Sequence, residues 1–129
     1  MTIEGRFINN QIKMRLILLG KLPSLNEHDK ANRANRYVGA SMKKTYTDGV
    51  FWDCRAQKLE AILRPVAIVC TWYRTNKRSD PDNICFAKKY ILDGLVKAGI
   101  LMDDGWDEIK RFEDHFRIGK EDKVIVELT

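Results

Sequence analysis

Cysteine, histidine and long apolar runs are all scarce in this sequence. The three cysteines (Cys54, Cys70 and Cys85) and the two histidines stand far apart, and no C-x-x-C pair occurs, so we expect free thiols in a reducing cytoplasm and no structural zinc. No stretch approaches the roughly 20 apolar residues that span a bilayer. Residues 1–7 also lack the apolar core of a signal peptide. We therefore expect a cytoplasmic protein with no membrane partner.

The chain does contain enough apolar material for a core. It has 129 residues, of which 44% are hydrophobic and 32% are charged, and no repeat or Pro/Gly-rich linker divides it. This length and composition predict a single domain over residues 1–129 and argue against a disordered tail.

The charge of the chain is uneven. The net charge is +5, because residues 1–102 carry 18 basic and 9 acidic side chains whereas residues 103–129 carry 5 basic and 9 acidic. Such a basic segment is typical of proteins that neutralise phosphates, although many basic soluble domains bind no nucleic acid.

Hydrophobic patterning predicts several strands. Residues 12–19 alternate and then become apolar, and Val66–Tyr73 is rich in β-branched and aromatic residues. A hairpin over residues 2–12, turning at Asn9-Asn10, and two later strands at 111–118 and 123–128 complete the set.

Two helical regions lie between these strands. Ser24 and Glu27 are spaced as a capping box, and helical sequence continues to about Leu63, as one long helix or as two helices bent near Asp48-Gly49. The second region runs from Asp82 to Gly99, with an apolar stripe at Ile84, Ile91 and Leu95. Because helices and strands interleave without regular βαβ alternation, we expect a two-layer α+β domain with a mixed sheet packed against helices.

Two acidic clusters flank the second helical region. Asp80 and Asp82 stand at its start, directly after the strand that ends at Tyr73, and Asp103-Asp104 follows Gly99. A helix of about 17 residues is ~25 Å long, so these clusters can converge only if residues 100–104 fold back toward the end of the strand.

Carboxylates in this setting favour a site for a divalent cation. Mg²⁺ is held by a few carboxylates and keeps several waters, and it can activate water against a phosphodiester. On a continuous helix Lys89 and Asp93 would share a polar stripe with Asp82. A structural interpretation also stands: Asp80 as an N-cap, Asp82 as a partner of the helix dipole, and Lys89, Asp93 and Lys97 as i,i+4 ion pairs.

At these residues the sequence resembles the RusA-type Holliday-junction resolvases. The resemblance is carried by Asp80-Pro-Asp-Asn83 followed by Leu92-Asp-Gly-Leu-Val-Lys-Ala-Gly-Ile-Leu-Met-Asp-Asp104. It covers about residues 74–104, and Pro23-Ser-Leu-Asn26 is similar to the Pro-Ser-x-Asn segment near the amino terminus of that family.

The resemblance implies an α+β fold and an enzyme. Members of the family are small homodimeric, Mg²⁺-dependent endonucleases, often encoded by phages or prophages, that nick two opposing strands of a four-way DNA junction. By position, Asp80, Asp82 and Asp104 match the metal-binding and catalytic aspartates, with Asp103 as an acidic neighbour. Mn²⁺ is an alternative ion.

The family lysine matches less cleanly. Lys89 corresponds to it when counted back from Asp93, but better-known members place it four residues after the second aspartate, where Phe86 stands here. Lys88 is the competing candidate and a further DNA contact. The remaining expected DNA contacts are the cations that follow the strand, Arg74, Lys77 and Arg78.

The sequence thus predicts an endodeoxyribonuclease that hydrolyses branched DNA in recombination and repair. Two alternatives stay open: a basic DNA-binding module without catalysis, and a related nuclease that acts on flaps or forks.

Overall fold

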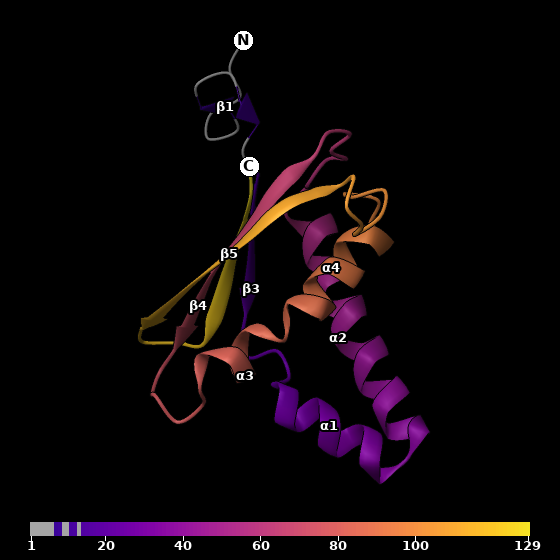
Figure 1. Cartoon of the computed structure of the whole chain (residues 1–129), viewed down its shortest axis with the longest axis vertical. Helices are drawn as coiled ribbons and strands as arrows, with labels where there is room; N and C mark the ends of the chain where they lie inside the picture. The colour runs from indigo at the N-terminus through magenta and orange to yellow at the C-terminus, as the bar shows by residue number, and fades with distance from the viewer. Residues whose placement is uncertain (1–6, 9–10, 13) are drawn as a thin grey trace.

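The computed structural model describes residues 7–8, 11–12 and 14–129, and the main sheet has four strands. These strands are β3 (Met14–Leu19), β4 (Val66–Arg74), β5 (Ile109–Ile118) and β6 (Lys123–Leu128), in the spatial order β3-β6-β4-β5. β6 pairs antiparallel with β3 and with β4, whereas β4 and β5 run parallel. The helices lie on one side of this sheet (Figure 1). The predicted two-layer α+β fold with a mixed sheet is confirmed.

A short antiparallel hairpin precedes the sheet. It is formed by β1 (Phe7–Ile8) and β2 (Gln11–Ile12), with Phe7 opposite Ile12. The pairing agrees with the predicted hairpin, while its expected turn at Asn9-Asn10 and residues 2–6 lie outside the described residues. The strand predicted over residues 12–19 is divided, because β2 ends at Ile12 and β3 begins at Met14.

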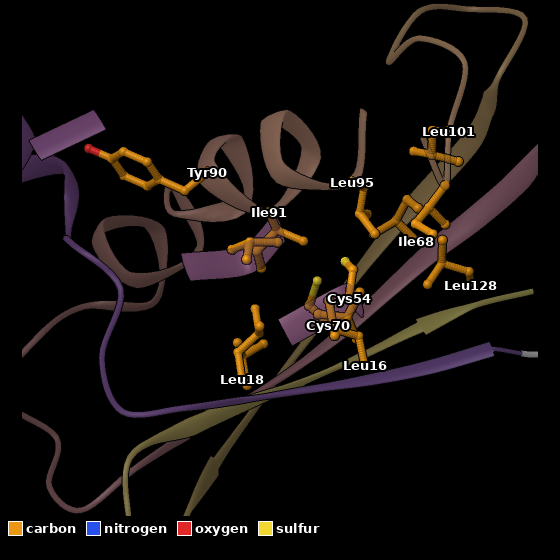
Figure 2. Close-up of a cluster of buried hydrophobic side chains, with 14 of the residues drawn as sticks. Leu16, Leu18, Cys54, Ile68, Cys70, Tyr90, Ile91, Leu95, Leu101 and Leu128 are labelled. Carbon is orange, nitrogen blue, oxygen red and sulfur yellow. The ribbon is translucent and has the colours of Figure 1, made fainter. Parts of the chain in front are cut away.

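Side-chain alternation along β3 shows how the sheet faces the core. Met14, Leu16 and Leu18 are buried, while the intervening residues are exposed. Figure 2 shows Leu16 and Leu18 pointing toward Ile91 and Leu95 on the facing helix. Burying one face of each strand against helices removes apolar surface from water, which is the main stabilising contribution to such a layer.

Helices α1 (Leu25–Ala34) and α2 (Arg36–Ala56) lie in the first predicted helical region, but α2 ends at Ala56, short of the expected end near Leu63. The capping box is present: Ser24 Oγ accepts from the Glu27 amide at 3.2 Å, and Glu27 Oε1 accepts from the Ser24 amide at 3.2 Å. The predicted bend near Asp48-Gly49 is wrong, because the helices separate at Asn35. Asn35 has an extended backbone, and its Oδ1 accepts from the Val38 amide at 2.9 Å. This side chain therefore caps the start of α2 in the middle of the predicted helical region.

The helix predicted over residues 82–99 is also divided. α3 (Pro81–Cys85) and α4 (Lys88–Lys97) are separated by a turn at Phe86-Ala87. Ile84, Ile91 and Leu95 are buried as expected. The predicted polar stripe from Asp82 to Lys89 required one continuous helix, so this prediction is wrong.

Close packing of α4 on α2 depends on Gly94. A Cβ atom at this position would lie 2.4 Å from the Val50 side chain on α2, so a larger residue would push the helices apart. The following residues leave the helix at Gly99, whose φ of +75° lies in the region that glycine adopts without strain. Gly94 thus sets how closely α4 packs on α2, and Gly99 allows the chain to turn after α4.

The cysteines agree with the expectation of free thiols. Cys54 and Cys70 are buried, Cys85 is half-buried, and all three thiols are free. Within the described part of the chain, none of the helices has the length and apolar character needed to cross a membrane.

Candidate functional site

Three of the expected DNA contacts, Arg74 at the end of β4 and Lys77 and Arg78 in the following loop, precede Asp80. Asp122 Oδ1 accepts from the Thr75 amide at 3.0 Å and anchors the start of the loop, and Asn76 Oδ1 accepts from the Arg78 amide at 3.0 Å within it. This anchoring fixes the backbone that carries Arg74, Lys77 and Arg78.

Asp80 and Asp82 stand together at the start of α3, and both are exposed. Asp80 occupies the N-cap position with an extended backbone (φ −73°, ψ 152°), yet its side chain makes no capping hydrogen bond within the described chain. Asp82 lies in the first turn. Asp80 is therefore the N-cap by position, as the structural interpretation expected, but its carboxylate makes no capping hydrogen bond and is left for solvent or a ligand.

The two sequence motifs of the resemblance meet at this position. The amide of Asn26, the last residue of Pro23-Ser-Leu-Asn26, donates to Asn83 Oδ1 at 3.0 Å. Figure 1 shows the start of α1 beside α3, although 57 residues separate the two asparagines. The two motifs are therefore in contact in the folded chain, which the sequence alone did not show.

A cleft opens beside Asp80 at the end of the sheet. Its volume is about 260 Å³, and its cationic lining includes Arg74 and Lys77. Its apolar lining comes from side chains on β4, α3 and β5, among them Trp72, Ile84 and Phe116. Cations and a carboxylate therefore border one hollow that is large enough for part of a nucleotide.

The two candidate lysines have different surroundings. Lys88 Nζ lies 2.6 Å from Asp114 Oδ2 and 4.5 Å from the centre of the Phe112 ring, and its side chain is 15% exposed. Lys89 is exposed. Lys88 is thus held within the fold, and Lys89 is the lysine that faces solvent.

Sequence reasoning missed Asp114, which holds this cluster together. Trp72 Nε1 donates to Asp114 Oδ1 at 2.9 Å, while Lys88 Nζ donates to the other carboxylate oxygen, Oδ2. A signal was available, because Asp114 alternates with Phe112 and Phe116 and so places a charge on the inward face of a predicted strand.

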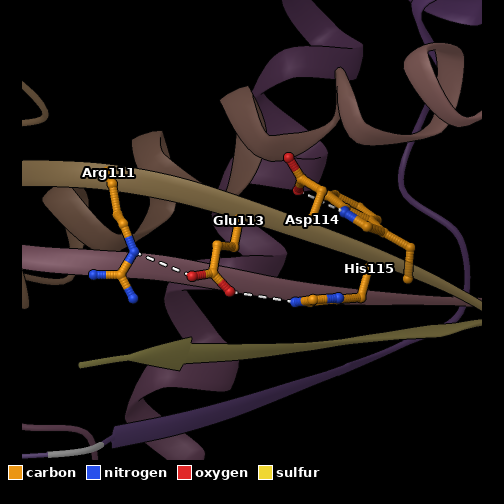
Figure 3. Close-up of polar contacts among 5 residues, drawn as sticks. Arg111, Glu113, Asp114 and His115 are labelled. Carbon is orange, nitrogen blue, oxygen red and sulfur yellow. Dashed lines mark hydrogen bonds and ion pairs between the residues drawn. The ribbon is translucent and has the colours of Figure 1, made fainter.

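The opposite face of β5 carries a separate polar row. Arg111 Nε donates to Glu113 Oε1 at 3.1 Å, and His115 Nε2 lies 3.3 Å from Glu113 Oε2 (Figure 3). Hydrogen bonds from His115 and Arg111 hold the pKa of Glu113 below its usual value. This row faces away from the helices, so it is not part of the Asp80–Asp82 site.

The second acidic cluster, Asp103-Asp104, lies at the other end of β4. The residues that follow it lead into β5, where the Val66 amide donates to the Glu108 carbonyl and Val66 pairs with Ile109. Figure 1 shows the segment between α4 and β5 at the upper right and the loop before α3 at the lower left. Nine residues of β4 span ~26 Å at about 3.3 Å per step, so one chain keeps Asp104 far from Asp80.

Asp103 and Asp104 share their surroundings with residues of α2 and α4. They line a hollow with Asp93, Lys43 and Lys97, and Lys43 Nζ lies 3.6 Å from Asp93 Oδ2. Lys97 pairs with Asp48 on α2. Asp93 and Lys97 therefore tie α4 to α2, instead of forming the i,i+4 row with Lys89.

These positions limit what one chain can hold. Among residues 7–8, 11–12 and 14–129, no group of three His, Cys, Asp or Glu side chains is placed to hold a metal ion. Oxygen ligands of one Mg²⁺ lie about 2.1 Å from it, so two of them cannot be more than about 4 Å apart. Asp80 and Asp82 nevertheless fit Mg²⁺ chemically, because this ion is commonly bound through one or two carboxylates and the phosphates of a substrate.

No protein-family model matches this chain, and no curated protein matches its sequence. The resemblance therefore depends on the motif residues themselves. The structure adds one independent fact about them: the Asn26 and Asn83 segments touch beside two exposed aspartates.

Proposed function

We propose that this protein is a Mg²⁺-dependent endonuclease for branched DNA that acts as a homodimer. The observation that supports this function best is the pair of exposed carboxylates, Asp80 and Asp82, beside a cleft lined by Arg74 and Lys77. Carboxylates suit a hard cation, and the neighbouring cations suit the phosphates of a nucleic-acid strand.

The residues of this site would have different roles in phosphodiester hydrolysis. A bound Mg²⁺ would polarise the scissile phosphate and lower the pKa of an attacking water. Asp80 and Asp82 would hold that ion, while Arg74 and Lys77 position the phosphate from the cleft and Arg78 contacts the strand beyond it. Lys89, which faces solvent near the start of α4, is the lysine free to approach the strand.

Asp104 can take part only from a second copy of the chain. Asp104 lies near the Val66 end of β4 and Asp80 follows its Arg74 end, and the ~26 Å length of this strand is several times the separation that two ligands of one ion allow. We propose that each active site combines Asp80 and Asp82 of one protomer with Asp104 of the partner subunit. A two-fold dimer would then present two equivalent sites, which matches the symmetry of a four-way junction.

The test is cleavage of a synthetic four-way junction with Mg²⁺ by the parent and by Asp82→Asn. In metal sites, loss of a side chain that only hydrogen-bonds a ligand already costs about 10- to 100-fold, so loss of a direct ligand should slow nicking at least about 100-fold. Asp53→Asn is the matched control, because it removes one carboxylate from α2 and should leave the rate unchanged. Equal nicking rates for the parent and Asp82→Asn would refute the assigned site.

The separation of Asp104 from Asp80 also favours a second candidate, a DNA-binding module without catalysis. Such a module would bind the junction in the presence of a chelator and produce no nicks with Mg²⁺ or Mn²⁺. If the parent does cut, a panel of junctions, flaps and forks would show whether four-way DNA is the preferred substrate.

A further inference from the structure

The cleft beside Asp80 has an apolar interior that phosphate binding does not require. Trp72 and Ile84 are buried at its base, Phe116 is partly buried, and Ile118 at the end of β5 is 55% exposed. A site for a phosphate alone would need only donors and cations. The apolar surface that remains open to solvent, on the partly buried Phe116 and the exposed Ile118, instead suits a flat, uncharged ring.

The border of the cleft is polar and mostly cationic. Arg74, Lys77 and Arg117 contribute positive charge, and the side chains of Asn76 and Ser79 add hydrogen-bonding groups. Stacking surfaces combined with cations that follow a backbone are the arrangement by which proteins hold single-stranded nucleic acid. The volume of about 260 Å³ is below the usual 300–1,000 Å³ of pockets for drug-sized ligands, so one ring system fits better than a larger ligand.

We propose that this cleft receives one unstacked nucleobase of a DNA strand, while Arg74, Lys77 and Arg117 hold the adjoining phosphates. The inference rests on the proposed function in one respect, namely that this strand is the one presented to Asp80 and Asp82. Bases at a branch point leave the stack at a smaller cost than bases within a duplex, so the cleft would favour branched over linear DNA. Asn76 and Ser79 would face the edge of the base.

The test compares two single strands of equal length in the presence of a chelator, one of thymidine and one made wholly of abasic nucleotides. Both carry the same phosphates, so the difference in affinity reports the bases alone. Stacking of a base on aromatic side chains typically contributes about 5- to 150-fold in affinity, and we expect the parent to prefer the thymidine strand by an amount in this range.

Filling the cleft provides the decisive variant. Ile118→Trp places an indole in the cleft from an exposed strand end and should reduce thymidine binding to the abasic level without changing abasic binding. Leu19→Trp makes a similar change at the exposed end of β3 and should keep the preference, as should Trp106→Ala, which removes a 98% exposed indole outside the cleft. Unfolding midpoints of all variants would show that each is folded.

Equal affinity of the parent for the two strands would overturn the base pocket, and so would an undiminished preference in folded Ile118→Trp. A different result would show that the nuclease proposal is wrong while the base pocket is right. In that case Asp82→Asn would cut like the parent, or the parent would not cut at all, but the preference for base-bearing strands in chelator would remain.

Discussion

Replacing Lys88 by methionine should destabilise the fold and leave DNA binding nearly unchanged. Lys88 Nζ lies 2.6 Å from Asp114 Oδ2, and the side chains are 15% and 20% exposed. Methionine keeps most of the aliphatic length that packs near Phe112 but leaves Asp114 with the Trp72 hydrogen bond as its remaining partner in this cluster. The perturbation therefore isolates the ion pair.

The expected magnitude follows from the burial of the pair. An exposed ion pair contributes about 0.2–1 kcal/mol, whereas removing one partner of a fully buried pair costs about 3–5 kcal/mol. Because four-fifths or more of each side chain is covered, we expect a loss of about 2 kcal/mol in the free energy of unfolding. For 129 residues, an unfolding entropy of about 2.1 cal/mol/K per residue converts this loss into a decrease in Tm of about 7 °C.

The assay is a double-mutant cycle of Lys88→Met and Asp114→Asn, followed by chemical denaturation and by junction binding in chelator. A coupling free energy above about 1 kcal/mol is expected, since the two groups contact each other directly. Lys89→Met, the matched control, should keep stability and weaken DNA binding. The reasoning would be refuted if Lys88→Met kept its stability and lost junction affinity, because Lys88 would then serve the DNA instead of Asp114.

Three further predictions concern stability and reactivity. Asn35→Ala removes the cap between α1 and α2 and should lower the free energy of unfolding by about 1 kcal/mol in denaturant titrations; an unchanged midpoint would show that this cap contributes nothing. Burial raises the pKa of Cys70 to about 12, so iodoacetamide at pH 8 should modify the half-buried Cys85 first, as peptide mass spectrometry would show, and equal rates would contradict this order. Hydrogen bonds from Lys44 and Lys97 lower the pKa of Asp48, so these ion pairs stabilise the fold above about pH 4 and their contribution declines as the pH falls further. Asp48→Asn should therefore destabilise the protein less at pH 2 than at pH 7, and an equal loss at both would refute the assignment.

Local patterns predicted the strands and the capping box because both depend on neighbouring residues. The run Val66–Tyr73 gave β4 to within one residue, and Lys123–Leu128 gave β6 at its observed bounds. The breaks in the helices depended on other information. Asn35 caps α2 from within a helical pattern, so composition alone did not distinguish it from a helical residue.

The turn between α3 and α4 is packed against the rest of the fold. Phe86 packs with its ring centre 4.9 Å from that of His28 on α1, and Ala87 is buried at 1% exposure. Neither residue type disfavours a helix strongly, so a periodicity argument continued the helix through them. With a continuous helix, the prediction placed Lys89 on the same face as Asp82 and gave Lys88 no structural role.

The part of the candidate site that comes from one continuous segment was predictable from the sequence. Asp80, Asp82 and the cations after β4 come from one short segment, so their proximity follows from chain connectivity. The position of Asp104 depends on the direction in which α4 runs along the sheet, and that direction is set by the packing of Gly94 against Val50 and by the parallel pairing of β5 with β4. Neither the packing of α4 on α2 nor the pairing of β5 with β4 could be read from the spacing of residues in the sequence.

Mixing two inactive variants tests most directly whether the active site is shared between protomers. In a dimer of Asp82→Asn with Asp104→Asn, one site would contain both changes and the other would contain the native Asp80, Asp82 and Asp104. Equal amounts, denatured and refolded together, should therefore recover about a quarter of the parent nicking rate on a four-way junction, mainly as single nicks. If the mixture stays as inactive as either variant alone, although heterodimers form, the shared site is wrong.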